Sequence, residues 1–161
     1  LGGTPEAASR VLKRFRGLDH RHQIVHEADG VRWVNDSKAT NVGAALAALG
    51  GYPDSSLHLI LGGQAKGQDF SVMAGEVERV AVRVYVIGID GHSIATCLAN
   101  TTPVVEYETL DEAVCAAREE AAPGQLVLLA PACASFDQFD GYAHRGRVFS
   151  ELARREVAPC P

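Results

Sequence analysis

The sequence predicts an α/β fold: a Rossmann-like, mostly parallel sheet of about six strands with helices on both faces. After an N-terminal hairpin, short apolar runs alternate with segments of helical periodicity. These runs show little polar alternation, which is typical of strands covered on both faces. The order strand, helix, strand, helix implies right-handed crossovers, and the hairpin is expected to add one antiparallel strand.

Residues 1–18 are expected to form an amphipathic linker helix, and residues 19–161 one domain. Thr4 and Pro5 are typical of a helix start, and apolar residues then recur on one face until Gly17. The chain begins with Leu1, inside a segment with a helical pattern. We therefore expect a domain cut from a longer protein.

The strands are expected at residues 23–27, 31–35, 57–61, 82–87, 104–107 and 125–129. The first two flank Ala28-Asp29-Gly30, a sequence that favours a tight hairpin turn. Apolar residues at helical spacing predict helices near residues 42–49, 70–77, 93–98, 110–117 and 136–155. A capping box, Thr109-x-x-Glu112, marks the start of the fourth of these.

The composition excludes several classes of protein. The chain has 161 residues, of which 47% are hydrophobic and 22% charged, with a net charge of −5, as in ordinary globular proteins. This charge disfavours nucleic-acid binding. No apolar run approaches the roughly 20 residues of a membrane-spanning helix. Four cysteines without a CxxC pair and six histidines without an HExxH pattern indicate no metal site and fit a reducing compartment.

Three loops that follow predicted strands carry most of the polar chemistry: residues 36–41 (DSKATN), 62–67 (GGQAKG) and 131–135 (PACAS). Ligands of open α/β sheets gather at the carboxyl ends of the strands, where these loops would converge. Lys38, Lys66 and the N–H groups of helix starts favour an anion there. The sequence therefore predicts a negatively charged ligand.

Each loop also has a purely structural interpretation. The Asp36, Ser37 and Asn41 side chains are good helix caps, and Gly62-Gly63 suits a strand-to-helix turn. Ser135 could cap the last helix, contact a ligand, or do both. The second loop lacks the GK[ST] ending of a P-loop, and no GxSxG elbow surrounds Ser135.

Four other residues are expected to have no role in ligand binding. Cys133 has no identifiable activating partner and is expected to be a small buried side chain. We expect Trp33 to pack in the core. The pair of histidines in His20-x-His22 is expected to face solvent.

Taken together in this order, three motifs resemble the C-terminal domain of the Mur ligases that add D-glutamate. They are GVRWVNDSKATN at residues 30–41, LGGQAKGQDF at 61–70, and PACASFDQF at 131–139 followed by Arg145-Gly146. The resemblance covers about residues 19–155. It implies a bacterial, cytoplasmic, ATP-dependent acid–amino-acid ligase of peptidoglycan synthesis, monomeric and with no membrane partner.

That resemblance also implies the reaction. D-glutamate is joined to UDP-N-acetylmuramoyl-L-alanine through an acyl phosphate, with ATP and Mg²⁺ bound mainly by a central domain that this chain lacks. The isolated chain is therefore expected to be inactive, and its lysines to position substrate rather than transfer protons. Ala130 and Tyr142 depart from the family, which often has Ser and Phe there.

The resemblance assigns roles to individual residues. Those expected to bind D-glutamate are Lys38, Thr40, Lys66 and Ser135, with the stretch from Phe136 to Tyr142 completing the pocket. For the nucleotide, Asp36 is expected to contact the ribose of ATP, and Arg21 to reach the nucleotide as the domain closes. No residue of this chain is expected to bind metal.

Two alternatives stay open at this point. The chain could be a stand-alone Rossmann-like module that binds carboxylates or nucleotides without ligase activity. It could also be the end domain of a related ligase such as a folylpolyglutamate synthase, which shares the architecture but not the pair of motifs DSKATN and PACAS.

Overall fold

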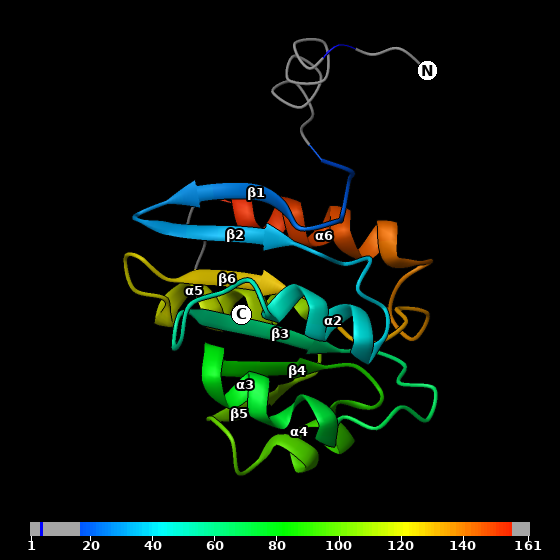
Figure 1. The fold of residues 1–161 in the computed structure, drawn as a ribbon. Coiled ribbons are helices and arrows are strands. Elements are labelled where there is room, and N and C mark those ends of the chain that lie inside the picture. The colour runs from blue at the N-terminus through cyan, green and yellow to red at the C-terminus, as the bar shows by residue number, and fades with distance from the viewer. Residues whose placement is uncertain (1–3, 5–16, 156–161) are drawn as a thin grey trace.

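The structure is a computed structural model that describes residue 4 and residues 17–155 (Figure 1). The linker helix predicted over residues 1–18 lies almost entirely outside the described residues. None of the helices in the described part is long and apolar enough to cross a membrane.

Six strands form one sheet in the order β1-β2-β6-β3-β4-β5. Strand β1 is antiparallel to β2, and the other four neighbouring pairs are parallel. The predicted fold class, including the N-terminal hairpin, is therefore confirmed. The bounds are β1 (Gln23–Ala28), β2 (Val31–Asn35), β3 (Leu57–Gly62), β4 (Ala81–Ile87), β5 (Val104–Tyr107) and β6 (Leu126–Leu129).

Helices cover both faces of this sheet, as Figure 1 shows with α2 in front and α6 behind. Successive strand residues point to opposite faces, so Leu59 packs with α2, α3 and α4 while Ile60 packs with α5 and α6. The bounds are α2 (Val42–Leu49), η1 (Ser71–Met73), α3 (Ala74–Val80), α4 (Gly91–Leu98), α5 (Leu110–Glu120) and α6 (Tyr142–Arg154).

Side-chain caps fix the starts of α2 and α5. The Asn41 side chain accepts a hydrogen bond from the N–H of Ala44 at 2.9 Å. In α5, Thr109 accepts from the N–H of Glu112, and Glu112 accepts from the N–H of Thr109. The capping roles predicted for Asn41 and for the Thr109-x-x-Glu112 box are confirmed.

The last helix is shorter than predicted, since it begins at Tyr142 and not at residue 136. Residues 136–141 form a turn, in which the carbonyl of Ser135 accepts from the N–H of Phe139 at 2.8 Å. The helix N-cap is Gly141, with φ of 157°. The aromatic residues of this turn have helical spacing, but they lie outside the helix. Because Gly141 is the N-cap, the interpretation of Ser135 as the N-cap is wrong.

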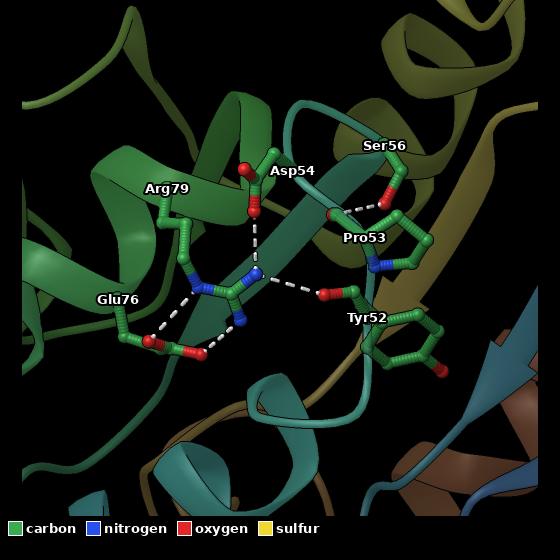
Figure 2. Close-up of polar contacts among 6 residues, drawn as sticks. All are labelled: Tyr52, Pro53, Asp54, Ser56, Glu76 and Arg79. Atoms are coloured by element: carbon green, nitrogen blue, oxygen red, sulfur yellow. Dashed lines mark hydrogen bonds and ion pairs between the residues drawn. The ribbon is translucent and has the colours of Figure 1, made fainter.

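Arg79 of α3 holds the segment that leads into β3 (Figure 2). Its guanidinium donates to the carbonyl of Tyr52 at 3.0 Å and to Asp54 at 2.7 Å, and it also pairs with Glu76. Single exposed ion pairs contribute little to stability. Here one guanidinium joins Tyr52, Asp54 and Glu76, and it thereby ties the segment before β3 to helix α3.

Candidate functional site

The loops after β2, β3 and β6 converge at one edge of the sheet, as predicted. From the neighbouring strands β6 and β3 the chain leaves toward opposite faces, because α6 and α3 pack on different sides. In α/β sheets, ligands bind at the strand ends where the chain diverges in this way. Residues 62–67 and 130–135 meet at this place through backbone hydrogen bonds, with residues 36–41 beside them.

Backbone hydrogen bonds join the three loops directly. Gln64 and Ala134 exchange two N–H to carbonyl bonds, at 2.9 and 3.0 Å. The N–H of Ala132 donates to the carbonyl of Ala39 at 2.9 Å. The loops thus form one connected platform rather than three independent segments.

The side chain of Arg145, which reaches these loops from α6, is fully buried. It donates to the hydroxyl and the carbonyl of Ser37 at 3.0 and 3.1 Å, to the carbonyl of Cys133 at 3.0 Å and to that of Gly62 at 3.3 Å. One guanidinium therefore holds all three loops. Burial lowers the pKa of Arg145 to about 10, so the group stays charged at neutral pH.

No role was predicted for Arg145 from the sequence beyond its place in a motif. A signal was present, because Arg145 lies four and seven residues before Phe149 and Leu152, on the buried side of α6. A charged residue on the inward face of a helix needs polar partners. Here those partners are loop carbonyls.

Glycine is required where the second loop turns. At Gly63, with φ of 123°, an added Cβ would lie 2.2 Å from the carbonyl oxygen of Ala134 and 3.2 Å from Nη1 of Arg145. At Gly62 it would lie 2.0 Å from the carbonyl oxygen of Ile87. The structural interpretation of this glycine pair is confirmed.

The two lysines of the platform each lie near an aromatic ring, one from the turn that precedes α6 and one from the first residue of that helix. The Nζ atom of Lys38 is 4.1 Å from the ring centroid of Tyr142, and that of Lys66 is 5.8 Å from the ring centroid of Phe136. Both are cation–π distances. Neither lysine forms an ion pair with any described carboxylate, so both positive charges are available to an anion.

Ser135 belongs to the third loop and is 2% exposed. Its hydroxyl is buried and has no hydrogen-bond partner among the described residues, and the same holds for Oδ1 of Asp137. Leaving a buried polar group unpaired costs about 1–3 kcal/mol. An unpaired hydroxyl at this place is the state expected of a group whose partner is a ligand.

Thr40 is half-buried, and its N–H donates to the carbonyl of Lys38 at 2.8 Å, which keeps both residues in one tight turn.

A separate pocket of about 320 Å³ adjoins the platform. It contains both residues predicted for the nucleotide, Arg21 and Asp36, together with His22 and Lys38, and one wall consists of alanines of α2 and its start. Burial raises the pKa of Asp36, while the backbone N–H of His22 opposes this shift. Charged groups opposite a small apolar wall suit a ligand with both a polar and a flat part.

The structure also corrects the expectation that His20 faces solvent. Its ring is half-buried, with Nδ1 at 3.1 Å from the amide nitrogen of Asn35. At Gly146 an added Cβ would lie 2.3 Å from that Nδ1. The carbonyl of His20 accepts from the N–H of Lys38 at 3.0 Å. The sequence gives no local signal for this contact, in which the backbone of His20 supports Lys38.

The described residues contain no group of three or more His, Cys, Asp or Glu side chains that could hold a metal ion.

Comparison with known proteins gives consistent results. A family model described as "Mur ligase, glutamate ligase domain" matches residues 20–133. The chain is 46% identical over 150 residues to the UDP-N-acetylmuramoylalanine–D-glutamate ligase of Pasteurella multocida, covering 92% of this chain and 34% of that protein. It is 47% identical over 147 residues to the enzyme of that name from Legionella pneumophila, covering 89% and 33%. The chain thus spans about a third of these relatives, at their C-terminal end.

Solved structures support the fold. A bifunctional folylpolyglutamate synthase/dihydrofolate synthase from Yersinia pestis superposes with a TM-score of 0.66 at 18% identity, covering 94% of this chain and 35% of that one. UDP-N-acetylmuramate-alanine ligase from Thermotoga maritima gives 0.63 at 16% identity, covering 88% and 31%.

Proposed function

This chain belongs to the Mur ligase family, as its C-terminal glutamate ligase domain, and we propose that it binds D-glutamate for a UDP-N-acetylmuramoylalanine–D-glutamate ligase. One observation carries the proposal: two lysines without carboxylate partners and a buried hydroxyl without a partner belong to loops that a single arginine joins. D-glutamate has two carboxylates. The ammonium groups of Lys38 and Lys66, together with the hydroxyls of Thr40 and Ser135, supply the charge and the donors to bind both.

Phe136 and Tyr142 complete the proposed pocket by limiting where the lysines lie. Each ring faces one ammonium group, and a cation held over a ring loses less freedom when it binds an anion. The hydroxyl of Tyr142 adds polarity at a position where a phenylalanine would be purely apolar.

In the whole enzyme, the carboxylate of UDP-N-acetylmuramoyl-L-alanine would take the γ-phosphoryl group of ATP. The amine of D-glutamate would then attack the carbonyl carbon of this acyl phosphate, and inorganic phosphate would leave as the amide forms. The contribution proposed for this chain is to position the amine and to neutralise the two glutamate carboxylates. No residue of the chain is assigned a proton transfer.

ATP would meet this domain at the pocket of Arg21 and Asp36, where a carboxylate can accept from the ribose and a guanidinium can meet a phosphate. Mg²⁺ would neutralise charge on the phosphates, and we propose that other domains supply its protein ligands. The sequence contains no P-loop motif, so we expect no turnover from this chain alone.

The site of action proposed for the whole enzyme is the bacterial cytoplasm, where ATP and UDP-linked precursors are available, and we expect a monomer. The stand-alone binding module is not favoured, because the relatives at 46 and 47% identity are named as ligases. The folylpolyglutamate synthases share this fold at only 14 to 21% identity.

The proposal is tested with Lys66→Met in the full-length parent enzyme. Methionine keeps much of the side-chain length and removes the charge, so we expect the KM for D-glutamate to rise at least about tenfold, equivalent to about 1.4 kcal/mol. Arg32→Gln, at an exposed residue paired only with Glu27, is the matched loss of charge and should leave the KM unchanged. An unchanged KM in Lys66→Met would refute the assignment.

A further inference from the structure

A second pocket, of about 490 Å³, lies at the end of the domain opposite the three loops. It is formed by the β1–β2 hairpin and by the C-terminal ends of α5 and α6. Strand β2 and helix α6 each run between the two ends: their other ends carry Asn35 and Tyr142, at the platform. This pocket is thus separate both from the lysine platform and from the pocket of Arg21.

Three arginines line the pocket: Arg118, Arg154 and Arg155. The guanidinium of Arg118 lies over the ring of Trp33, with Cζ 5.2 Å from the ring centroid, and donates to the carbonyl of Leu152. Arg154 donates to the carbonyl of Val25 at 3.1 Å. Each of these contacts fixes a guanidinium with only one of its five N–H donors.

The remaining donors are largely unused within the described residues. Within residues 17–155 the three arginines form one ion pair, which joins Arg155 to Asp111 at 3.3 Å between two exposed side chains. Asp29 is the one acidic residue among the described residues that line the pocket. Three positive charges therefore face two negative ones, in a chain whose net charge is −5.

The proximity of these charges has a cost that an anion would offset. Burial lowers the pKa of Arg118, and the positive charge of Arg155 lowers it further, against the opposing effect of Asp111. Both effects disfavour the charged form of the Arg118 guanidinium. An anion between the arginines would favour it and would use their free donors.

We propose that this pocket is a second binding site, for a small organic anion with two or more phosphate or carboxylate groups. The guanidinium forks would hold the oxyanions, and Val31, Ala121 and Ala153 offer an apolar surface to the rest of the ligand. The volume lies in the range of small-molecule sites. Nothing in the proposed ligase reaction uses this pocket, so the inference stands apart from that function.

The test uses this chain and the fluorescence of Trp33, its only tryptophan, with calorimetry as a second readout. The probes are pyrophosphate and citrate at low ionic strength. We expect saturable binding of at least one probe, and which one saturates identifies a phosphate or a carboxylate ligand. Arg118→Gln and Arg155→Gln should each weaken the affinity at least about tenfold, as the loss of a charged hydrogen bond requires.

Three control variants separate this site from general charge effects. Arg32→Gln removes an equal charge from the same hairpin outside the pocket and should leave the affinity unchanged. The double variant Lys38→Ala/Lys66→Ala should also bind normally, because its changes lie at the platform. Ala121→Leu keeps all three arginines but fills the pocket, and it should abolish binding while thermal unfolding shows a folded chain.

The proposal is overturned if neither probe gives a saturable signal, or if Arg32→Gln weakens binding as much as Arg118→Gln does. It is also overturned if the double lysine variant abolishes binding, because the probe would then occupy the platform.

Discussion

Arg145 binds Ser37 twice, through Nε to the hydroxyl at 3.0 Å and through Nη2 to the backbone carbonyl at 3.1 Å. The same hydroxyl donates to the carbonyl of Tyr142 at 2.8 Å. The start of α6 and the loop after β2 are therefore locked together, and with them Lys38 and the ring it faces. The geometry of the lysine platform depends on a residue that is itself too deeply buried to meet a ligand.

Replacing this arginine should destabilise the domain. In Arg145→Lys the positive charge remains, but one ammonium group cannot reach the four acceptors that the guanidinium spans. Leaving carbonyls of Gly62 and Cys133 unpaired should lower the free energy of unfolding by at least about 2 kcal/mol, measured by urea denaturation. Arg147→Lys, at an exposed residue of the same helix, is the control and should change stability little. Equal stabilities of the two variants would contradict the clamp.

Gly63 and Gly75 provide a matched pair of glycine substitutions. Gly63→Ala places a methyl group 2.2 Å from the carbonyl oxygen of Ala134 at a φ of 123°, so it should destabilise by more than about 2 kcal/mol. Gly75 lies in α3 with nothing within 4 Å of an added Cβ, so Gly75→Ala should stabilise by up to about 1 kcal/mol. Thermal or urea unfolding of both variants checks the opposite signs, and a stable Gly63→Ala would show that the loop can open.

The hydroxyl of Ser135 should matter for ligand binding and not for folding. Ser135→Ala removes a buried group without a protein partner, so stability should stay equal or rise slightly. In the full-length parent the KM for D-glutamate should rise roughly tenfold, as expected for one hydrogen bond to a charged group. Ser56→Ala, which loses a bond to the carbonyl of Pro53, should show the reverse, with a small loss of stability and a normal KM.

The ring of Tyr142, and not its hydroxyl, should support Lys38. Tyr142→Phe keeps the face that lies 4.1 Å from Nζ of Lys38, so the KM for D-glutamate should stay within about twofold of the native value. Tyr142→Ala removes that face and should raise the KM clearly more. If phenylalanine is as harmful as alanine, the hydroxyl itself contacts the substrate.

Cys133 should resist alkylation in the folded protein. Burial raises the pKa of its thiol to about 12, so at pH 8 the thiol is protonated and hardly nucleophilic. Cys97 is free and exposed, and it serves as the internal control. Mass spectrometry after iodoacetamide treatment should find label on Cys97 and none on Cys133 until a denaturant is added. Rapid labelling of native Cys133 would contradict the buried position.

Much of the fold was predictable because its signals are local. The apolar run of residues 57–61 has no alternation, and it became the central strand β3. The Thr109-x-x-Glu112 box acts within one turn, and it caps α5 as predicted. The three loops follow from the same logic, since parallel strands bring their carboxyl ends to one edge whatever the side chains are.

The start of α6 could not be predicted from local sequence signals. The aromatic spacing through residues 136–155 fits a helix, and only the turn closed by Ser135 and Phe139 delays the helix to Tyr142. That delay leaves Phe136 and Tyr142 exposed, one near each lysine.

The sequence by itself therefore determined the class of fold, the order of its strands along the chain and the residue types that gather at one edge. Only the tertiary structure decided how those residues are held. Arg145 contacts Ser37 across 108 positions and Gly62 across 83, and Trp33 meets Arg118 from a different element. Periodicity and capping act over a few residues, whereas a buried guanidinium is positioned by whichever acceptors the packed chain brings within about 3 Å of it.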